Sequence, residues 1–313
     1  MREFIIQEND ANQRVDKFIT KTMKTMPKNL MYKYIRNKKI KVNRSRCEIS
    51  QRLVVGDSVQ CYIAEEFFEQ EIKQNFLELP SSLDILFEDE NLLIVNKPSG
   101  LLAHSDVREV QDNLADRVLH YLYLKKEYDC ASQLSFCPAL CHRIDRNTQG
   151  IVIAAKNAEA LREMNEKIRL REVKKKYLCI VEGKLPKKSE LLTLYHMKLA
   201  GNKADIRKEP KDGYQEIKTA YKVLEERSHH SLLEIDLLTG KSHQIRAVMA
   251  YLKHPLVGDV KYGARKDAQT TYQALCAYKV SFHFRDVQGL LGYLNDRTIE
   301  LENVDVVKRF HSL

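Results

Sequence analysis

The chain has 313 residues, 43% of them hydrophobic and 30% charged, a composition typical of a globular protein with one large core or two domains. No apolar stretch approaches the ~20 residues that cross a bilayer, and the N-terminal MREFIIQEND lacks the apolar core of a signal peptide. Seven scattered cysteines fit reduced thiols better than a disulfide framework. We therefore expect a cytoplasmic protein with no membrane partner.

The net charge of +9 is distributed unevenly. Residues 1–64 hold 14 Lys and Arg against 6 Asp and Glu, residues 65–80 hold 1 against 5, and residues 81–313 hold 37 against 32. This pattern predicts a small basic domain (1–64), an acidic linker (65–80) and a large domain (81–313). A concentrated basic patch favours a polyanionic partner, most often nucleic acid, although charge alone fits a solvated lysine-rich surface equally well.

The small domain is predicted to contain two short basic helices and a small sheet. The helices, at 14–25 and 29–37, each have one apolar face, formed by Val15, Phe18, Ile19 and Thr22 in the first and by Leu30 and Tyr34 in the second. The segments IKVN (40–43) and VVGDSVQCYI (54–63) predict short strands around a Gly-Asp turn.

Three segments of this domain, QRVDKFI, YKYIRNKKIKVN and LVVGDSV, resemble the RNA-binding domain first named from ribosomal protein S-four. The resemblance covers about residues 12–64 and implies that the helix pair and the following turn bind structured RNA through its phosphates. The cations on that face would be Lys33, Arg36, Lys38, Lys39, Lys41 and Arg44. Because charge and pattern agree, we interpret the domain as RNA-binding.

The large domain shows helix and strand patterns in irregular order. The segments at 84–87, 92–96, 151–155, 177–183 and 232–238 predict strands, and a tight turn, Lys97-Pro98-Ser99-Gly100, follows the second of them. Helices are predicted at 114–125, after an Asn157 N-cap, and at 242–253 with Ser242 as N-cap. The order favours an α+β fold over a doubly wound sheet.

Asp145 is the first candidate for chemistry, because it lies between Arg143 and Arg146 on a polar loop ahead of a buried strand. Adjacent cations favour the ionised form, so we expect a pKa below the reference of ~3.9 and a nucleophile or electrostatic stabiliser. An isolated Asp–Arg pair is more typical of a structural salt bridge. If Tyr177 and the helical residue Arg246 converge on the same cleft, they would add a stacking platform and a partner for the carboxylate.

Five segments of the large domain resemble the RluA family of pseudouridine synthases, over nearly all of residues 82–285. They are DILFEDENLLIVNKPSGLLAH, HRIDRNTQGIVIAAKN, REVKKKYLCIVEG, LLTGKSHQIR and HPLVGDVKYG. The resemblance implies a mixed, largely antiparallel central sheet with a catalytic cleft. It also implies conversion of uridine in RNA to its C-glycoside isomer, without a cofactor or a metal.

The resemblance also implies roles for individual residues. Asp145 matches the catalytic aspartate that attacks the nucleoside, and Arg246 matches the arginine that holds it ionised. Tyr177 matches the tyrosine that stacks on the uracil and helps to remove the C5 proton. Arg143 matches the arginine that occupies the stack vacated by the flipped nucleotide. Further substrate or RNA contacts are expected from His142, Lys175 and His243.

The chain departs mildly from the family pattern, with Asn147 and Gln149 in place of Asp and Ser, and none of these changes touches the four roles above. The S-four-like domain favours large-subunit ribosomal RNA as the target of a monomeric enzyme. Two alternatives remain open, namely a synthase acting on transfer RNA and a catalytically silent RNA-binding or ribosome-assembly factor. The joint presence of Asp145, Tyr177 and Arg246 speaks against the silent factor.

Overall fold

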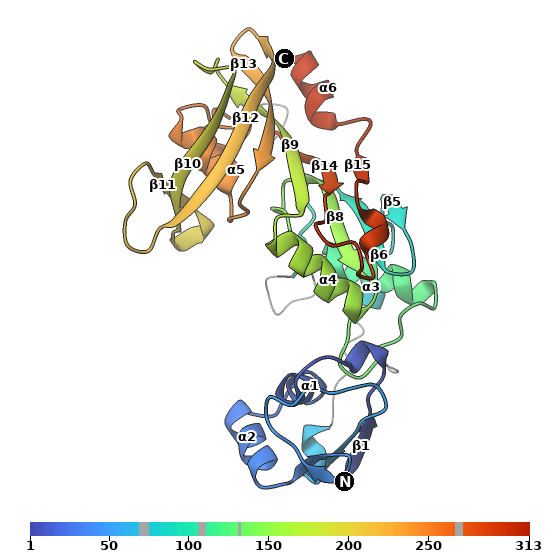
Figure 1. Ribbon diagram of the computed structural model, residues 1–313. Coiled ribbons are helices and arrows are strands. Elements are labelled where there is room, and N and C mark those ends of the chain that lie inside the picture. Colours follow the sequence, from blue (N-terminus) through green and yellow to red (C-terminus); the bar gives the residue numbers. More distant parts are fainter. Residues whose placement is uncertain (69–74, 106–110, 131–132, 267–271) are drawn as a thin grey trace.

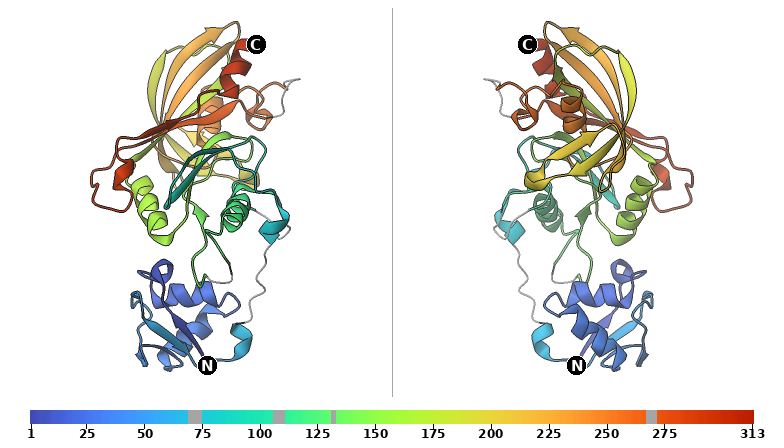
Figure 2. Two further views of the ribbon diagram at one scale, coloured as in Figure 1. Left: turned by 90° about the vertical axis from the view of Figure 1, so that its right-hand side faces the viewer. Right: turned by 90° about the vertical axis from the view of Figure 1, so that its left-hand side faces the viewer.

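Figure 1 shows the computed structural model of the chain, which describes residues 1–68, 75–105, 111–130, 133–266 and 272–313. The chain forms a small N-terminal part and a large part, and each has its own sheet and hydrophobic core. The two parts lie one above the other in all three views, with the chain ends at opposite extremes (Figures 1 and 2). Within the described residues, no helix has both the length and the apolarity needed to cross a bilayer.

The small part is an antiparallel sheet in the order β1-β4-β2-β3, covered by two helices. Val15, Phe18 and Ile19 are fully buried in its core, as their helical spacing predicts. The elements are β1 (Arg2–Ile5), the 3-10 turn η1 (Glu8–Asp10), α1 (Val15–Thr22), α2 (Lys28–Arg36), β2 (Ile40–Val42), β3 (Ser45–Arg46) and β4 (Ser58–Cys61).

Two details of the small part differ from the prediction. In α2 the buried residues are Met31 and Ile35, one position beyond the predicted Leu30 and Tyr34, which are half-buried. The predicted strand before the Gly-Asp turn does not form, because Asp57 accepts a hydrogen bond from the Val54 amide (2.9 Å) and turns that segment out to solvent. Strand β4 pairs instead with β1, which the sequence did not reveal.

The acidic segment 65–80 is anchored at both of its described ends. The short turns η2 (Glu65–Phe67) and η3 (Asn75–Glu78) frame it. Phe68 is buried in the core of the small part and Phe76 in a core of the large part. Aromatic anchors therefore hold this predicted linker to each part, and residues 69–74 between them lie outside the described residues.

The large part contains an 11-stranded sheet, in the order β11-β10-β12-β13-β9-β14-β8-β6-β5, with β15 added to β14 and β7 to β8. Every pair is antiparallel except β14 and β8, which confirms the mixed, largely antiparallel α+β prediction. The strands are β5 (Ile85–Glu88), β6 (Leu92–Lys97), β7 (Ala139–Leu140), β8 (Gln149–Ala155), β9 (Val173–Glu182), β10 (Ser189–Lys198), β11 (Ala204–Arg207), β12 (Gln215–Arg227), β13 (His230–Leu237), β14 (Leu275–Phe282) and β15 (Thr298–Glu300).

Helices pack on both faces of this sheet. The apolar sides of α3 (Leu114–Leu124) and α5 (Gln244–Tyr251) join one hydrophobic cluster, and those of α4 (Ala158–Arg169) and α6 (Asp305–Ser312) join a second. Three short 3-10 turns complete the part, namely η4 (Ala200–Asn202), η5 (Val260–Tyr262) and η6 (Gly292–Leu294). Burial on both faces explains the continuous apolar run of β8.

Hydrogen bonds join the two parts. The Asp10 carboxylate, 2% exposed, accepts from the backbone amide (3.0 Å) and the hydroxyl (2.6 Å) of Ser135. The Asn9 side chain accepts from the amide of Ala158 (3.0 Å), the first residue of α4, and the predicted N-cap Asn157 accepts from Ala160 (2.8 Å). Turn η1 of the small part is thereby fixed on the N-terminus of α4.

Candidate active site

Asp145 lies on the loop between β7 and β8, at the point where β8 joins β14. Gly150 is required there, because a Cβ atom would lie 2.3 Å from the carbonyl oxygen of Ala277. The loop closes with a hydrogen bond from the Thr148 amide to the Asp145 carbonyl (3.0 Å). The predicted loop before a buried strand is therefore present, and these contacts fix the position of the Asp145 side chain.

The turn after β6 braces this loop. Arg146 donates through Nε to the Gly100 carbonyl (3.0 Å) and accepts at its own carbonyl from the Gly100 amide (3.0 Å), while Ser99 donates to the Asn147 carbonyl (2.8 Å). Arg146 therefore has a structural partner and does not pair with Asp145. The other flanking cation, Arg143, is exposed and makes no hydrogen bond or ion pair with the described residues.

Beneath the turn lies a fully buried lysine that the sequence did not reveal as part of the site. Lys97 donates to the carbonyls of Pro98 (2.8 Å), Leu101 (2.7 Å) and Arg146 (2.9 Å). Burial lowers the pKa of Lys97 to about 7, and the charge of Asp145 opposes that shift. Lys97 therefore ties the β6 turn to the loop that carries the carboxylate.

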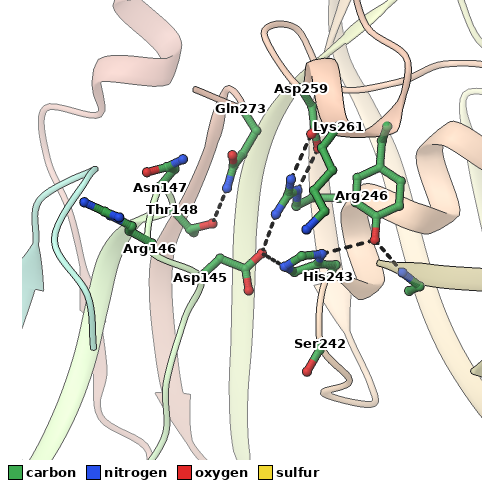
Figure 3. Close-up of polar contacts among 12 residues, drawn as sticks. Asp145, Arg146, Asn147, Thr148, Ser242, His243, Arg246, Asp259, Lys261 and Gln273 are labelled. Atoms are coloured by element: carbon green, nitrogen blue, oxygen red, sulfur yellow. Dashed lines mark hydrogen bonds and ion pairs between the residues drawn. The ribbon is translucent and has the colours of Figure 1, made fainter. Parts of the chain in front are cut away.

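Arg246 on α5 is the actual partner of Asp145. Its Nη1 lies 3.1 Å from Oδ2 of Asp145, while Nε and Nη2 donate to the two oxygens of Asp259 at 2.7 and 2.8 Å (Figure 3). Burial opposes the charge of Arg246, but the hydrogen bonds and charges of Asp259 and Asp145 raise its pKa. Oδ1 of Asp145 has no partner among the described residues, so one oxygen is held and the other is free.

Asp259 is a member of the site that sequence reasoning missed. It belongs to the HPLVGDVKYG segment, where a Gly-Asp pair looks like an ordinary turn. Its side chain is only 1% exposed and its carboxylate is fully used by Arg246. Three charged side chains from separate segments thus form one chain of contacts, with Asp259 holding Arg246 and Arg246 holding Asp145.

His243 is next to this chain, but not as the sequence predicted. The N-cap of α5 is His243 rather than Ser242, and its backbone is left-handed, with φ 56° and ψ 20°. Its Nε2 lies 3.8 Å from Oδ2 of Asp145, and its Nδ1 lies 3.1 Å from the hydroxyl of Tyr262. Burial lowers the pKa of His243, against the opposing charge of Asp145. His243 therefore caps α5, and Arg246 lies in the first turn of that helix.

Tyr177 lies near the same carboxylate, on β9 between β13 and β14. It is buried, and its hydroxyl makes no hydrogen bond with the described residues. Burial raises its pKa, and the negative charge of Asp145 adds to the shift. The phenol therefore keeps its proton at neutral pH.

The remaining predicted substrate contacts occupy two neighbouring positions. His142 accepts a hydrogen bond at Nε2 from the Ile153 amide (3.3 Å), and its buried Nδ1 has no partner in the part of the chain that the structure describes. Burial lowers the pKa of His142, with a further contribution from the charge of Lys175. Burial also lowers the pKa of Lys175 itself. His142 and Lys175 therefore lie close to each other, but the free nitrogen of His142 is buried and not presented to a bound RNA.

The six predicted RNA-binding cations lie together at the end of α2 and around β2. None of them forms an ion pair with a described residue. Lys41 is half-buried, and the other five are exposed, namely Lys33, Arg36, Lys38, Lys39 and Arg44. Lys39 and Lys41 rest on the rings of Tyr34 and Tyr62, at 5.2 and 5.3 Å. This surface is positive and without acidic neighbours in contact, as phosphate binding requires.

Comparison with known proteins identifies the family. A family model described as RNA pseudouridylate synthase matches residues 91–251. An uncharacterized RNA pseudouridine synthase of Mycoplasma capricolum subsp. capricolum is 33% identical over 314 residues, which cover 99% of this chain and all of the relative. Ribosomal large subunit pseudouridine synthase C of Buchnera aphidicola subsp. Baizongia pistaciae is 34% identical over 266 residues, covering 83% of this chain and 80% of the relative.

A solved structure shares the fold. Human RNA pseudouridylate synthase domain containing 4 superposes with a TM-score of 0.57 at 20% identity, covering 73% of this chain and 92% of that one. The predicted resemblance of the large part to pseudouridine synthases is thereby confirmed by sequence relatives and by the fold. The chain belongs to the RNA pseudouridylate synthase family, and is an isomerase.

Proposed function

We propose that this chain converts specific uridines of large-subunit ribosomal RNA to pseudouridine, acting in the cytoplasm as a monomer with Asp145 as nucleophile. The observation that carries the proposal is the asymmetry of the Asp145 carboxylate. Arg246 holds Oδ2, and Oδ1 is free on a loop braced from below. The relatives named ribosomal large subunit pseudouridine synthase C support the choice of RNA.

The reaction requires two successive bond exchanges at C1′ of the sugar, the first with Asp145 and the second with C5 of the uracil. Oδ1 of Asp145 bonds to C1′ of the uridine as the C1′–N1 bond breaks, and the electron pair of that bond stays on the uracil. After the base rotates, its C5 bonds to C1′ and Asp145 leaves with its electron pair. C5 then loses its proton and N1 gains one, so that the product is an isomer of the substrate.

Tyr177 suits the second half of this sequence. Its ring would stack on the detached uracil and hold it against C1′. While Asp145 is ionised, its charge helps to keep the phenol protonated. When Asp145 bonds to the sugar that charge is lost, so the phenol ionises more easily at the stage where the C5 proton must be removed.

RNA contacts provide access to the target nucleotide. A stacked uridine must be extruded before Oδ1 can reach C1′, which costs a few kcal/mol. The exposed Arg143 would fill the vacated position in the stack, and the half-buried Lys175 would donate to the extruded nucleotide. The six cations of the small part, Lys33, Arg36, Lys38, Lys39, Lys41 and Arg44, would contact phosphates farther along the RNA.

The test of this proposal is Asp145→Asn, which is nearly isosteric and removes the nucleophile. With ribosomal RNA containing C5-tritiated uridine, the wild type should release tritium and the variant none, at unchanged RNA affinity and thermal stability. Equal release by both proteins would sink the role of Asp145. Release by neither protein would favour a silent RNA-binding factor. Release by the wild type from labelled transfer RNA but not from ribosomal RNA would identify transfer RNA as the substrate.

A further inference from the structure

His243 has a left-handed backbone conformation, which is unusual for a residue other than glycine. A non-glycine residue with φ near 56° is in the left-handed region, where an L side chain costs free energy. The N-cap position would accept Ser, Asn or Asp, whose side chains bond to the helix, but His243 makes no capping hydrogen bond. Its imidazole instead faces Asp145 with one nitrogen (Figure 3). The other nitrogen contacts the hydroxyl of Tyr262.

The hydrogen bonds of Tyr262 favour one tautomer of the His243 imidazole. The Tyr262 oxygen accepts from the backbone amide of Ala204 at 2.8 Å. The phenolic hydrogen then has one partner among the described residues, Nδ1 of His243 at 3.1 Å. An Nδ1 that accepts leaves the proton of the neutral ring on Nε2. That Nε2 faces Oδ2 of Asp145.

We propose that Tyr262 and His243 are positioning residues, which rests on the proposed function: Tyr262 fixes His243 as the Nε2–H tautomer, and this N–H supplies Oδ2 of Asp145 with a second hydrogen bond beside that of Arg246. The present separation of 3.8 Å shortens to a hydrogen bond when the substrate closes the site. With both donors on Oδ2, Oδ1 is directed at the nucleoside.

The surroundings of His243 favour its neutral form. Burial lowers its pKa, and the cations Arg246 and Lys261 act in the same direction, against Asp145 and Asp259. A neutral ring has one N–H to donate, so its tautomer decides whether Asp145 receives a hydrogen bond. Tyr262 also touches the site through its ring, which packs edge-on against His243 and lies 5.1 Å from the guanidinium of Arg246.

Two substitutions of His243 separate its hydrogen bond from its backbone role. In His243→Gln the amide nitrogen can reach the position of Nε2, whereas in His243→Asn it reaches only the position of Nδ1. Asn adopts the left-handed backbone and the N-cap more readily than Gln does. If Nε2–H matters, His243→Gln should keep kcat near the wild-type value and His243→Asn should lose about 10- to 100-fold. A purely structural role predicts the opposite order.

Tyr262→Phe keeps the ring contacts with His243 and Arg246 and removes only the hydroxyl. We expect kcat to fall by a factor similar to that of His243→Asn, at unchanged KM. In the His243→Asn background the same change should have no further effect, because both act through one hydrogen bond. A wild-type kcat for Tyr262→Phe, or independent losses in the double variant, would overturn the proposal.

The tautomer can be read without any turnover. In ¹⁵N-histidine-labelled protein, the NMR signals of the His243 ring are assigned as those missing from a His243 variant whose thermal melt shows that it is folded. In the wild type this ring should have a protonated Nε2 and an unprotonated Nδ1. Tyr262→Phe should give a mixture of tautomers. A protonated Nδ1 in the wild type would refute the inference. Failure of the proposed function is a separate result, because it would appear as tritium release by Asp145→Asn or as none by the wild type.

Discussion

At the scale of single residues, the site depends on a buried carboxylate, Asp259. Asp259 is buried and its two oxygens clamp Arg246, which leaves one guanidinium nitrogen to reach Asp145. A guanidinium is suited to this because its planar donors serve two carboxylates at once. Arg246 therefore contributes both to the stability of the fold, through Asp259, and to the site, through Asp145.

Arg246→Ala should therefore lose both stability and activity. The buried Asp259 carboxylate would be left unpaired, and breaking such a pair typically costs ~3–5 kcal/mol in the free energy of unfolding. The double variant Arg246→Ala with Asp259→Ala should recover most of this loss but no pseudouridine formation, because Asp145 still lacks its partner. Urea unfolding and tritium release measure the two effects. A single variant as stable as the wild type would contradict the clamp.

Tyr177→Phe should separate stacking from proton transfer. The ring that would stack on the uracil remains, and such stacking is worth ~1–3 kcal/mol per base, so RNA affinity should hold. Product formation should be lost, because the phenolate oxygen that would take up the C5 proton is gone. Tyr177→Leu is the matched control and should weaken binding as well. Filter binding and tritium release are the measurements, and normal turnover by Tyr177→Phe would remove the hydroxyl from the slow step.

At the scale of helices and strands, the sequence predicted what depends on periodicity and missed what depends on contacts between distant segments. The apolar run of β8 and the amphipathic helices α1 and α4 lie where their patterns place them. Asp145 and Arg246 stood out because their residue types carry chemistry in recognisable segments. Lys97 and Asp259 did not stand out, because each lies in a segment that looks like an ordinary turn. Their importance comes from contacts with Arg146 and Arg246, which belong to other segments of the chain.

Lys97→Met should loosen the braced loop. The substitution keeps the length of the side chain and leaves buried carbonyls without a donor, at about 1–3 kcal/mol each. We expect a lower urea midpoint and a reduced kcat, because the Arg146 carbonyl in the Asp145 loop loses one of its two donors and keeps only the Gly100 amide. Lys167, also buried but on α4 against Glu172 and the Asp286 carbonyl, is the control. Lys167→Met should cost stability and spare kcat; equal kcat losses would argue against a specific brace.

At the scale of the whole molecule, the hydrogen bonds between the two parts set where the basic surface lies relative to Asp145. Asn9 and Asn157, one from each part, both accept amide hydrogens at the N-terminus of α4, so the small part helps to cap a helix of the large one. The Asp10–Ser135 contact adds a second point of attachment. Two points of attachment favour one orientation over a free tether, so the basic surface keeps a fixed distance from Asp145.

Neutralising the basic surface should weaken RNA binding without affecting chemistry. We expect the triple variant Lys33→Gln, Arg36→Gln and Lys39→Gln to lower the slope of log affinity against log salt by about 0.7–0.9 for each RNA phosphate that the protein no longer neutralises. At saturating RNA its kcat should equal that of the wild type, since these residues belong to the small part and the chemistry to the large one. The control variant changes three exposed lysines of the large part, Lys184, Lys253 and Lys308, to Gln and removes the same charge. If both triple variants flatten the salt dependence equally, net charge rather than this surface binds the RNA.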